Sequence, residues 1–155
     1  MRVEWALLAN AAEGPPNGLI YILGAGLDTF WRPQLPAQFA GAVVIRIAIN
    51  RSEANRPHAV EIQCNDEDGT PILPQPIVLQ LGNVQAPPDL PVGWDISANL
   101  VAVLNGMALP RAGLYSFEIL LDGQHAKSLP FRVVLGLPPG TIQVPDAGPA
   151  QPGGA

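Results

Sequence analysis

Apolar and polar residues alternate along many short stretches of this 155-residue chain. Such alternation is typical of β-strands that bury one face. It is clearest over Gly113–Leu121 and Gln124–Leu135, and the Asp122-Gly123 pair between them is a favoured tight turn. These two stretches are therefore predicted to form a hairpin, with Tyr115 and Phe117 on its buried face.

The same pattern predicts further strands before the hairpin. They cover Val3–Ala11, Leu19–Leu23, Val43–Ile49, Val60–Cys64, Ile77–Leu81 and Ile96–Leu104. The prolines and glycines between these stretches lie where turns are expected, and no long stretch has helical periodicity free of Pro or Gly. The predicted fold class is all-β, an immunoglobulin-like antiparallel β-sandwich of about eight strands.

Tyr115 supports the immunoglobulin-like part of this prediction. In such domains a Tyr stands two residues before a core residue at the start of a late strand, and its hydroxyl bonds back to the preceding loop. Tyr115 and Phe117 have this spacing. The alternative is that Tyr115 is an ordinary core aromatic with an exposed hydroxyl, and the spacing favours neither interpretation over the other.

The length suits one domain, predicted over residues 1–136. Apolar residues make up 48% of the chain and charged residues only 14%. This balance excludes disorder for most of the chain, because disorder requires low hydrophobicity and high charge. Residues 137–155 are rich in Pro, Gly and Ala and almost uncharged, so they are predicted to be a flexible tail.

The charge pattern excludes some partners. The formal net charge is −5 and Lys127 is the only lysine, so nucleic-acid binding is not expected. The longest uncharged stretch, Gly69–Pro88, is broken by prolines, which argues against a membrane span. Cys64 is the only cysteine, and the N-terminal apolar run has Glu4 where a signal peptide needs a basic region. The protein is therefore predicted to be cytoplasmic.

No residue pattern predicts catalysis or a cofactor. Gly24-Ala25-Gly26 follows a predicted strand, but Thr29 stands where a dinucleotide-binding loop needs its third glycine. A glycine-rich bend between strands is expected there instead. No serine stands in a Gly-x-Ser-x-Gly elbow. We therefore expect no catalytic residue, no cofactor and no enzyme activity.

A metal site is not predicted either. Asp66–Gly69 resembles part of a calcium loop, but the first ligand would then be the thiol of Cys64, and calcium prefers oxygen. A turn between strands explains the segment, and a weak surface cation site at Asp66 and Asp68 is the alternative. His58 lies too far along its strand from Cys64 for both to bind one ion, so Cys64 is interpreted as a small buried apolar residue.

The candidate interface residues are Phe30, Trp31, Arg32 and Trp94. An aromatic and cationic cluster in a predicted loop has the composition of a binding hot spot. The alternative is that these rings cap one end of the sandwich. Flat aromatic side chains can also stack on sugar rings, so Trp31 and Trp94 are the candidates for a small-molecule or carbohydrate site.

Three groups of residues occur together and in order along the chain. They are Ala6-x-Leu8-Ala9-Asn10-Ala11-Ala12, then Ile22-Leu23-Gly24-x-Gly26-x-Asp28, and then Gly113-x-Tyr115-x-Phe117 with Asp122-Gly123 and Pro130-Phe131-x-Val133. Over Arg2–Leu135 the chain resembles a family of short, uncharacterised bacterial β-sandwich proteins, a domain of unknown function that is frequent in actinobacteria. The resemblance implies the sandwich and a bacterial cytoplasmic setting, and it implies no activity, cofactor or site residue.

These observations predict a non-catalytic structural or protein-interaction module, within a homo-oligomer or a larger bacterial assembly. Few charges and unpaired outer strands favour this function, because a bare apolar strand edge attracts another chain. A protein partner or self-association is expected, whereas nucleic acid and membrane are not. The alternative is a β-sandwich that binds a small molecule or a carbohydrate.

Overall fold

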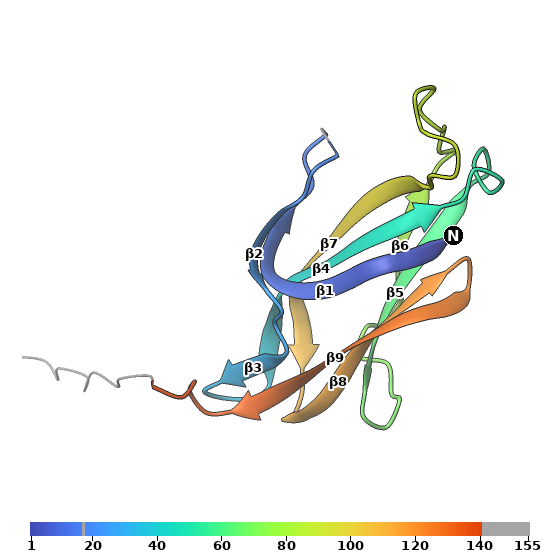
Figure 1. The fold of residues 1–155 in the computed structure, drawn as a ribbon. Coiled ribbons are helices and arrows are strands. Elements are labelled where there is room, and N and C mark those ends of the chain that lie inside the picture. The colour runs from blue at the N-terminus through green and yellow to red at the C-terminus, as the bar shows by residue number, and fades with distance from the viewer. Residues whose placement is uncertain (17, 141–155) are drawn as a thin grey trace, which may run out of the picture.

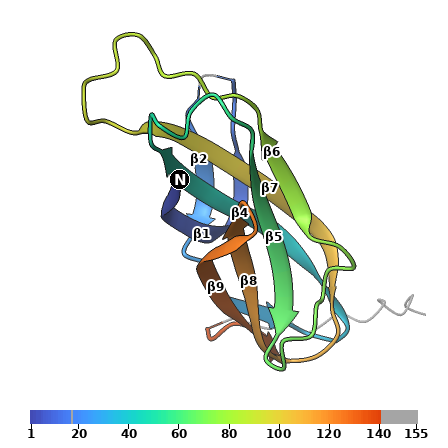
Figure 2. The ribbon, with the colours of Figure 1, turned by 90° about the vertical axis from the view of Figure 1, so that its right-hand side faces the viewer.

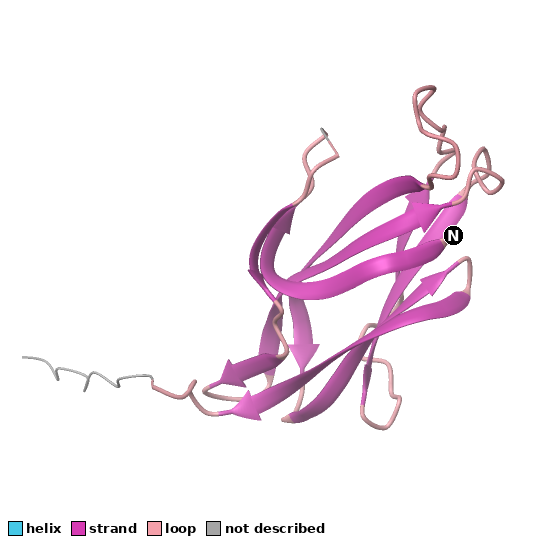
Figure 3. Ribbon diagram, in the orientation of Figure 1, coloured by secondary structure: helices cyan, strands magenta, loops and turns pink. Residues whose placement is uncertain are grey.

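The computed structural model describes residues 1–16 and 18–140, and within these ranges the chain is all-β, as predicted (Figure 1). Figure 3 shows strands joined by loops. The described residues contain no helix that is long and apolar enough to cross a membrane. Residues 141–155, most of the predicted tail, lie outside the described residues. The strands are β1 (Arg2–Glu13), β2 (Tyr21–Ala25), β3 (Thr29–Arg32), β4 (Ala37–Ile49), β5 (His58–Asp66), β6 (Ile77–Leu81), β7 (Ile96–Leu109), β8 (Gly113–Leu121) and β9 (Gln124–Leu135).

The strands form two sheets, which lie one against the other in Figures 1 and 2. Sheet A has the order β2-β1-β4-β7, and all its pairs are antiparallel. Sheet B has the order β3-β9-β8-β5-β6, and all its pairs are antiparallel except the parallel pair of β3 with β9. The edge strands are therefore β2 and β7 in sheet A, and β3 and β6 in sheet B.

The core lies between the two sheets, where the alternating apolar residues of both meet. Phe39 of β4 joins the layers, because its ring centroid lies 5.3 Å from that of Phe117 on β8 and 5.7 Å from that of Phe131 on β9. Tyr115 stacks on Phe131 with centroids 5.4 Å apart. Each such buried ring stabilises the fold by about 1.5–3 kcal/mol relative to an exposed ring. This aromatic cluster therefore holds the two sheets together.

The predicted hairpin is confirmed as β8 and β9. Asp122 and Gly123 have φ values of +49° and +79°. Positive φ at both central positions is the conformation of a type I′ turn, whose twist suits a hairpin and which Asp-Gly favours. The turn places Tyr115 opposite Phe131, so the two predicted apolar stripes face the core together.

Three strands differ most from the prediction. β7 continues through Asn105-Gly106 to Leu109 rather than ending at Leu104. Thr29–Arg32 was expected to be a loop and instead forms β3, which brings the strands of the described residues to nine, and β4 begins at Ala37 rather than Val43. β3 has only four residues, and its partner β9 is so distant that Thr29 and Arg132 are 103 positions apart. A strand this short, stabilised by a remote neighbour, has no local alternation from which it could be predicted.

The predicted glycine-rich bend is confirmed between β2 and β3, where the chain passes from sheet A to sheet B. Gly24 and Gly26 have φ values of +65° and +83°. A Cβ at Gly24 would lie 2.4 Å from Nδ2 of Asn10, so a side chain there would displace Asn10 and strain a backbone with positive φ. The N–H groups of Gly26 and Leu27 both donate to the carbonyl of Leu8, at 3.0 and 3.1 Å, and so hold the bend against β1.

Candidate functional site

The structure does not bring the predicted interface residues together. Phe30 is 3% exposed, because its ring lies 4.6 Å from Phe39 in the core. It therefore lies on a strand and not in the predicted loop, and its burial fits the alternative that this ring packs on the sandwich. Trp31 and Arg32 are half-buried on β3, and the guanidinium of Arg32 lies 5.2 Å from the centroid of Phe30. Trp94 is 66% exposed in the loop between β6 and β7, which lies at the other end of the molecule from β3 (Figures 1 and 2).

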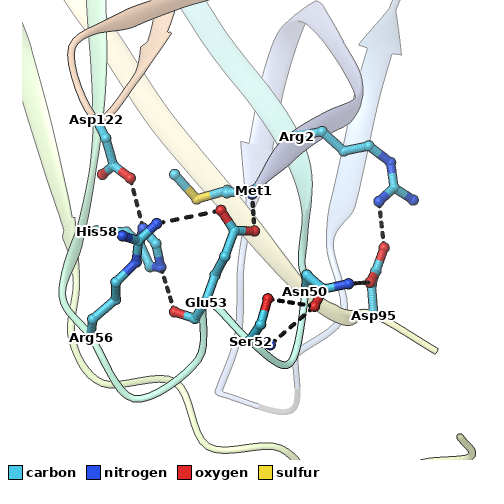
Figure 4. A network of polar contacts seen from close by, with 9 residues as sticks. All are labelled: Met1, Arg2, Asn50, Ser52, Glu53, Arg56, His58, Asp95 and Asp122. Carbon is cyan, nitrogen blue, oxygen red and sulfur yellow. Dashed lines mark hydrogen bonds and ion pairs between the residues drawn. The ribbon is translucent and has the colours of Figure 1, made fainter. Parts of the chain in front are cut away.

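His58 is the buried polar residue of the core, with 1% of its surface exposed. Figure 4 shows it between two acceptors: Nδ1 lies 2.8 Å from Oδ2 of Asp122, and Nε2 lies 2.9 Å from the carbonyl oxygen of Glu53. The other carboxylate oxygen of Asp122 accepts the N–H of Ala59 at 2.9 Å. The turn residue Asp122 thus links the β8–β9 hairpin to the first residues of β5 by hydrogen bonds.

These contacts explain the electrostatics of Asp122. Partial burial would raise its pKa, but hydrogen bonds from Ala59 and His58 outweigh this effect, so the pKa lies below the ordinary value. Both ring nitrogens of His58 are engaged within the protein. Their partners are oxygen acceptors of the protein, and the side chain is 1% exposed, so neither nitrogen faces a position for a substrate.

A polar cleft of about 520 Å³ lies beside this cluster, and its lining includes Arg2, Glu53 and Arg56. Its charged side chains bind one another. Glu53 accepts from the N-terminal amino group of Met1 and from Arg56, and Arg2 pairs with Asp95 (Figure 4). Such pairing leaves no single sign of charge with which the cleft would select a ligand.

The acidic segment after β5 is a turn, as the first interpretation of Asp66–Gly69 expected. Oδ1 of Asp66 accepts the N–H groups of Asp68 at 3.0 Å and Thr70 at 2.8 Å. Arg111 lies over the turn, and its Nη2 lies 3.0 Å from carboxylate oxygens of both Asp66 and Asp68. An arginine therefore occupies the position of the alternative cation site, and the described residues contain no group of three or more side chains that could hold a metal ion.

A Ser, His and Glu cluster lies on the exposed face of the β8–β9 hairpin. Nε2 of His125 lies 2.7 Å from Oε2 of Glu118 and 3.1 Å from Oγ of Ser128. In a nucleophilic triad the carboxylate and the serine contact opposite ring nitrogens, so that the imidazole can take the serine proton. Here both contact the same nitrogen, and the cluster therefore lacks the geometry of a proton relay.

Cys64 lies in the core on β5, as predicted, with 1% of its surface exposed. Burial, and to a smaller extent the charge of Glu118, raise the pKa of its thiol to about 12. A thiol becomes a nucleophile and a strong metal ligand when it ionises. Cys64 is consequently an unreactive apolar residue of the core.

The edge of sheet A at β7 has a different chemistry. β7 has 14 residues, and within the described residues it pairs with β4 alone. None of its residues is charged and none is proline. The other three edge strands are shorter, with five residues in β2, four in β3 and five in β6. Natural edges are protected by shortness, charge, proline or bulges, and the first ten residues of β7 have none of these devices.

A shallow groove of about 340 Å³ follows this edge. Asn99–Val101 and Val103 line it on β7, Leu79 of β6 lines one side, and Ala12–Gly14 at the end of β1 lines the other. The side chain of Val103 is 59% exposed there. We call the outer side of β7 together with this groove the β7 edge. Its free backbone N–H and C=O groups can pair with an additional strand.

The strand Ile96–Leu104 was predicted from its alternation, but nothing in that alternation marked it as a site. Whether a strand lies at the edge of a sheet depends on strand order, which hydrophobic alternation does not contain. The absence of charge and proline from Ile96–Leu109 was the signal that could have directed attention to it. His58 was likewise missed, because its partner Asp122 is 64 positions away.

The fold and this edge define the class: a small all-β domain with two sheets, one of which ends in a long, uncharged strand. Comparison with known families then gives the identity. The chain belongs to the Family of unknown function (DUF6941), whose model matches residues 4–134. The predicted membership in a domain of unknown function is therefore confirmed. No curated protein and no solved structure matches the chain.

Proposed function

We propose that this chain is a non-catalytic protein-interaction module that receives an extended segment of a protein partner along the β7 edge. The observation that carries the proposal is the edge itself: 14 residues with no charge and no proline, paired on one side only within the described residues. Main-chain hydrogen bonds give affinity when a strand is added to a sheet, and contacts with alternate side chains give specificity. The groove beside Leu79 and Val103 provides those side-chain contacts.

The polar clusters of the described residues support a non-catalytic role. His58 has both ring nitrogens engaged, and Glu118 and Ser128 approach the same nitrogen of His125. Arg111 pairs with the carboxylates of the acidic turn. In each cluster the reactive groups face one another rather than a site for a substrate, which is typical of side chains that stabilise a fold.

We also infer that the two sheets form an immunoglobulin-like sandwich. The hydroxyl of Tyr115 donates to the carbonyl of Arg111 at 2.8 Å, which supports the tyrosine contact expected at the start of strand F. With β8 as strand F, the neighbours β9 and β5 are strands G and C, and β1, β4 and β7 are strands A, B and E. In this order strand D would follow strand E. The β7 edge is therefore the place where the fold has room for one more strand.

The setting of the protein stays a prediction. A bacterial and cytoplasmic origin follows from the resemblance and from the single cysteine, Cys64, and from no contact in the structure. The alternative function, small-molecule or carbohydrate binding, depends on Trp31 and Trp94, which lie at opposite ends of the molecule.

A strand-addition experiment tests the proposal. A short alternating Thr-Val peptide, with terminal lysines for solubility, is titrated into the full chain while hydrogen exchange is followed along the sequence. We expect slower exchange in β7 and unchanged exchange in β6. Val103→Lys should weaken peptide binding at least about tenfold, because it places a charge in the groove that the peptide must cover.

The matched control is Val78→Lys on β6, where the side chain is 47% exposed but lies on the other sheet. This variant should bind the peptide like the wild type. Protection that appears on β2 or β3 instead, or equal weakening by both lysines, would refute the β7 edge as the binding surface.

A further inference from the structure

The sequence of β7 contains a palindrome. Asn99-Leu100-Val101-Ala102-Val103-Leu104-Asn105 reads the same in both directions about Ala102. The whole palindrome lies within β7 and pairs with β4 on its inner side. The palindrome ends at Asn105, and the next residue, Gly106, has φ +88°. Gly106 has no partner in β4, because Asn105 and Met107 pair with the consecutive residues Ala40 and Phe39. The symmetric segment is therefore the regular part of the edge, bounded by a bulge.

A palindromic edge strand is complementary to itself. In an antiparallel pair, residues directly opposite each other lie on the same face of the sheet. When two copies of β7 pair about a twofold axis through Ala102, every residue of the palindrome meets a residue of the same type. Closed twofold contacts of this kind, in which both chains use the same surface, are the commonest basis of homodimers.

We propose that the strand received at the β7 edge is β7 of a second copy, paired antiparallel about Ala102. This inference rests on the proposed function and names its partner. The two four-stranded A sheets then join into one continuous sheet across the dimer. Along the palindrome, the contact satisfies the outer backbone groups of both copies at once.

Side chains on the outer face of the sheet support this register. Val101 faces the partner's Val103, and β-branched residues opposite each other stabilise a sheet. Asn99 faces the partner's Asn105. One N–H of the Asn99 amide already donates to the carbonyl of Gly18 at 2.6 Å, and a side-chain amide has a second N–H for the partner's amide oxygen.

Charge favours a second copy at this surface. Each chain has a formal net charge of −5, so most contacts between two copies would bring acidic surfaces together. The palindrome contains no charged side chain, so no charge of one copy lies directly opposite a charge of the other in the ladder, and Glu13 lines the groove beside it. Like charges in an interface cost several kcal/mol, so the uncharged edge is the surface on which self-association is least opposed.

The alternative registers are less complementary. A shift of one residue would place outward-facing side chains opposite inward-facing ones. A shift of two residues keeps the faces but places Asn99 opposite a valine, so an amide loses its polar partner. The palindrome thus selects one register, and Gly106 prevents a regular ladder from extending past its end.

Cysteine crosslinking tests this register. In the variant Val101→Cys/Val103→Cys of the full chain, each cysteine lies opposite a cysteine of the partner, at a Cα separation of about 4.5–5.5 Å that suits a disulfide. We expect oxidised glutathione to convert most of the protein to a covalent dimer. Cys64 does not compete, because it is 1% exposed and burial raises the pKa of its thiol to about 12.

The matched control is Val101→Cys/Asn105→Cys. In the proposed register its cysteines lie only diagonally from one another, about 7–8 Å apart, so crosslinking should be at least about tenfold slower. If the control crosslinks as fast as or faster than the first variant, the register about Ala102 is wrong.

Sedimentation of the unmodified chain measures dimer formation directly, so this test does not depend on the cysteine variants. We expect a concentration-dependent dimer, and Val103→Lys should raise the dimer dissociation constant at least about tenfold while Val78→Lys leaves it unchanged. A chain that stays monomeric up to about millimolar concentration, near the weak limit of specific binding, would overturn the dimer. If that monomer still binds the Thr-Val peptide at β7, the proposed function stands and only its partner is refuted.

Discussion

Strands β5 and β7 are held in the fold in opposite ways. β5 is an inner strand of sheet B with ladders on both sides. A polar side-chain contact holds each of its ends, His58 with Asp122 at the start and Asp66 with Arg111 at the end. β7 has one ladder, to β4, and on its outer side only the groove. The molecule therefore holds both ends of an inner strand by polar side-chain contacts, whereas β7, which has no charged residue, is held by its ladder and by hydrogen bonds of Asn99 with Arg46 and Gly18. If β7 serves the proposed function, recognition depends on β7 and not on β5, and we expect that stability and association can be altered separately.

Removing the contact between His58 and Asp122 at the start of β5 should have the largest effect on stability. His58→Ala leaves a cavity and takes partners from Asp122 and from the carbonyl of Glu53, so we expect a loss of about 2–4 kcal/mol in the free energy of unfolding. Urea denaturation measures it. His125→Ala removes an imidazole that is exposed on the hairpin and should change stability by less than about 0.5 kcal/mol; equal losses in the two variants would mean that burial of His58 contributes nothing.

The converse change at β7 should affect association and not folding. Val103→Lys lies on the solvent side of the edge, so the free energy of unfolding of the monomer should stay within about 0.5 kcal/mol of the wild type. The dimer dissociation constant should rise at least about tenfold, which corresponds to about 1.4 kcal/mol. Urea denaturation at low protein concentration, combined with sedimentation, separates the two quantities. A strongly destabilised monomer would show that β7 is a folding element like β5.

The contact between Asp66 and Arg111 at the end of β5 should make the stability depend on pH. The N–H of Thr70, and then the guanidinium of Arg111, hold the pKa of Asp66 below its ordinary value. A carboxyl whose pKa is lowered on folding stabilises the fold above its unfolded pKa, near 3.9, and loses that contribution as the pH falls through the folded value. Asp66→Asn should therefore flatten the decline in stability below about pH 4. Urea titrations from neutral pH downwards test this, with Val103→Lys as the variant that should keep the wild-type profile.

Reactivity of Cys64 gives the smallest expected difference. The thiol is buried on β5, so a thiol reagent should label it only when the core opens. Val103→Lys should change the labelling rate of the monomer by less than about twofold, since it leaves the core intact. His58→Ala should accelerate labelling strongly. If the lysine variant is labelled as fast as the alanine variant, the two strands are not independent.

Local patterns allowed much of this fold to be predicted. The β8–β9 hairpin followed from alternation and from Asp122-Gly123. The spacing of Tyr115 and Phe117 left a bond from the tyrosine hydroxyl to the preceding loop as one of two interpretations, and the structure has this bond, to Arg111. The features that were missed depend on distant pairs. β3 needs β9, His58 needs Asp122, and the open edge at β7 is a property of strand order. The sequence left open whether Phe30 is exposed or packed, because its buried position follows from the same unpredicted strand.

The parallel pair of β3 with β9 also has a consequence for the order of folding. Thr29 and Arg132 on these strands are 103 positions apart, and contacts of such high sequence separation form late, because the entropy of closing the intervening loop must be lost first. During synthesis β3 leaves the ribosome long before its partner exists. We therefore expect sheet B to form from β5, β8 and β9 first and to take up β3 last. Phe30 would then enter the core as the final aromatic side chain, so the two layers become fully joined only after the ninth strand has been made.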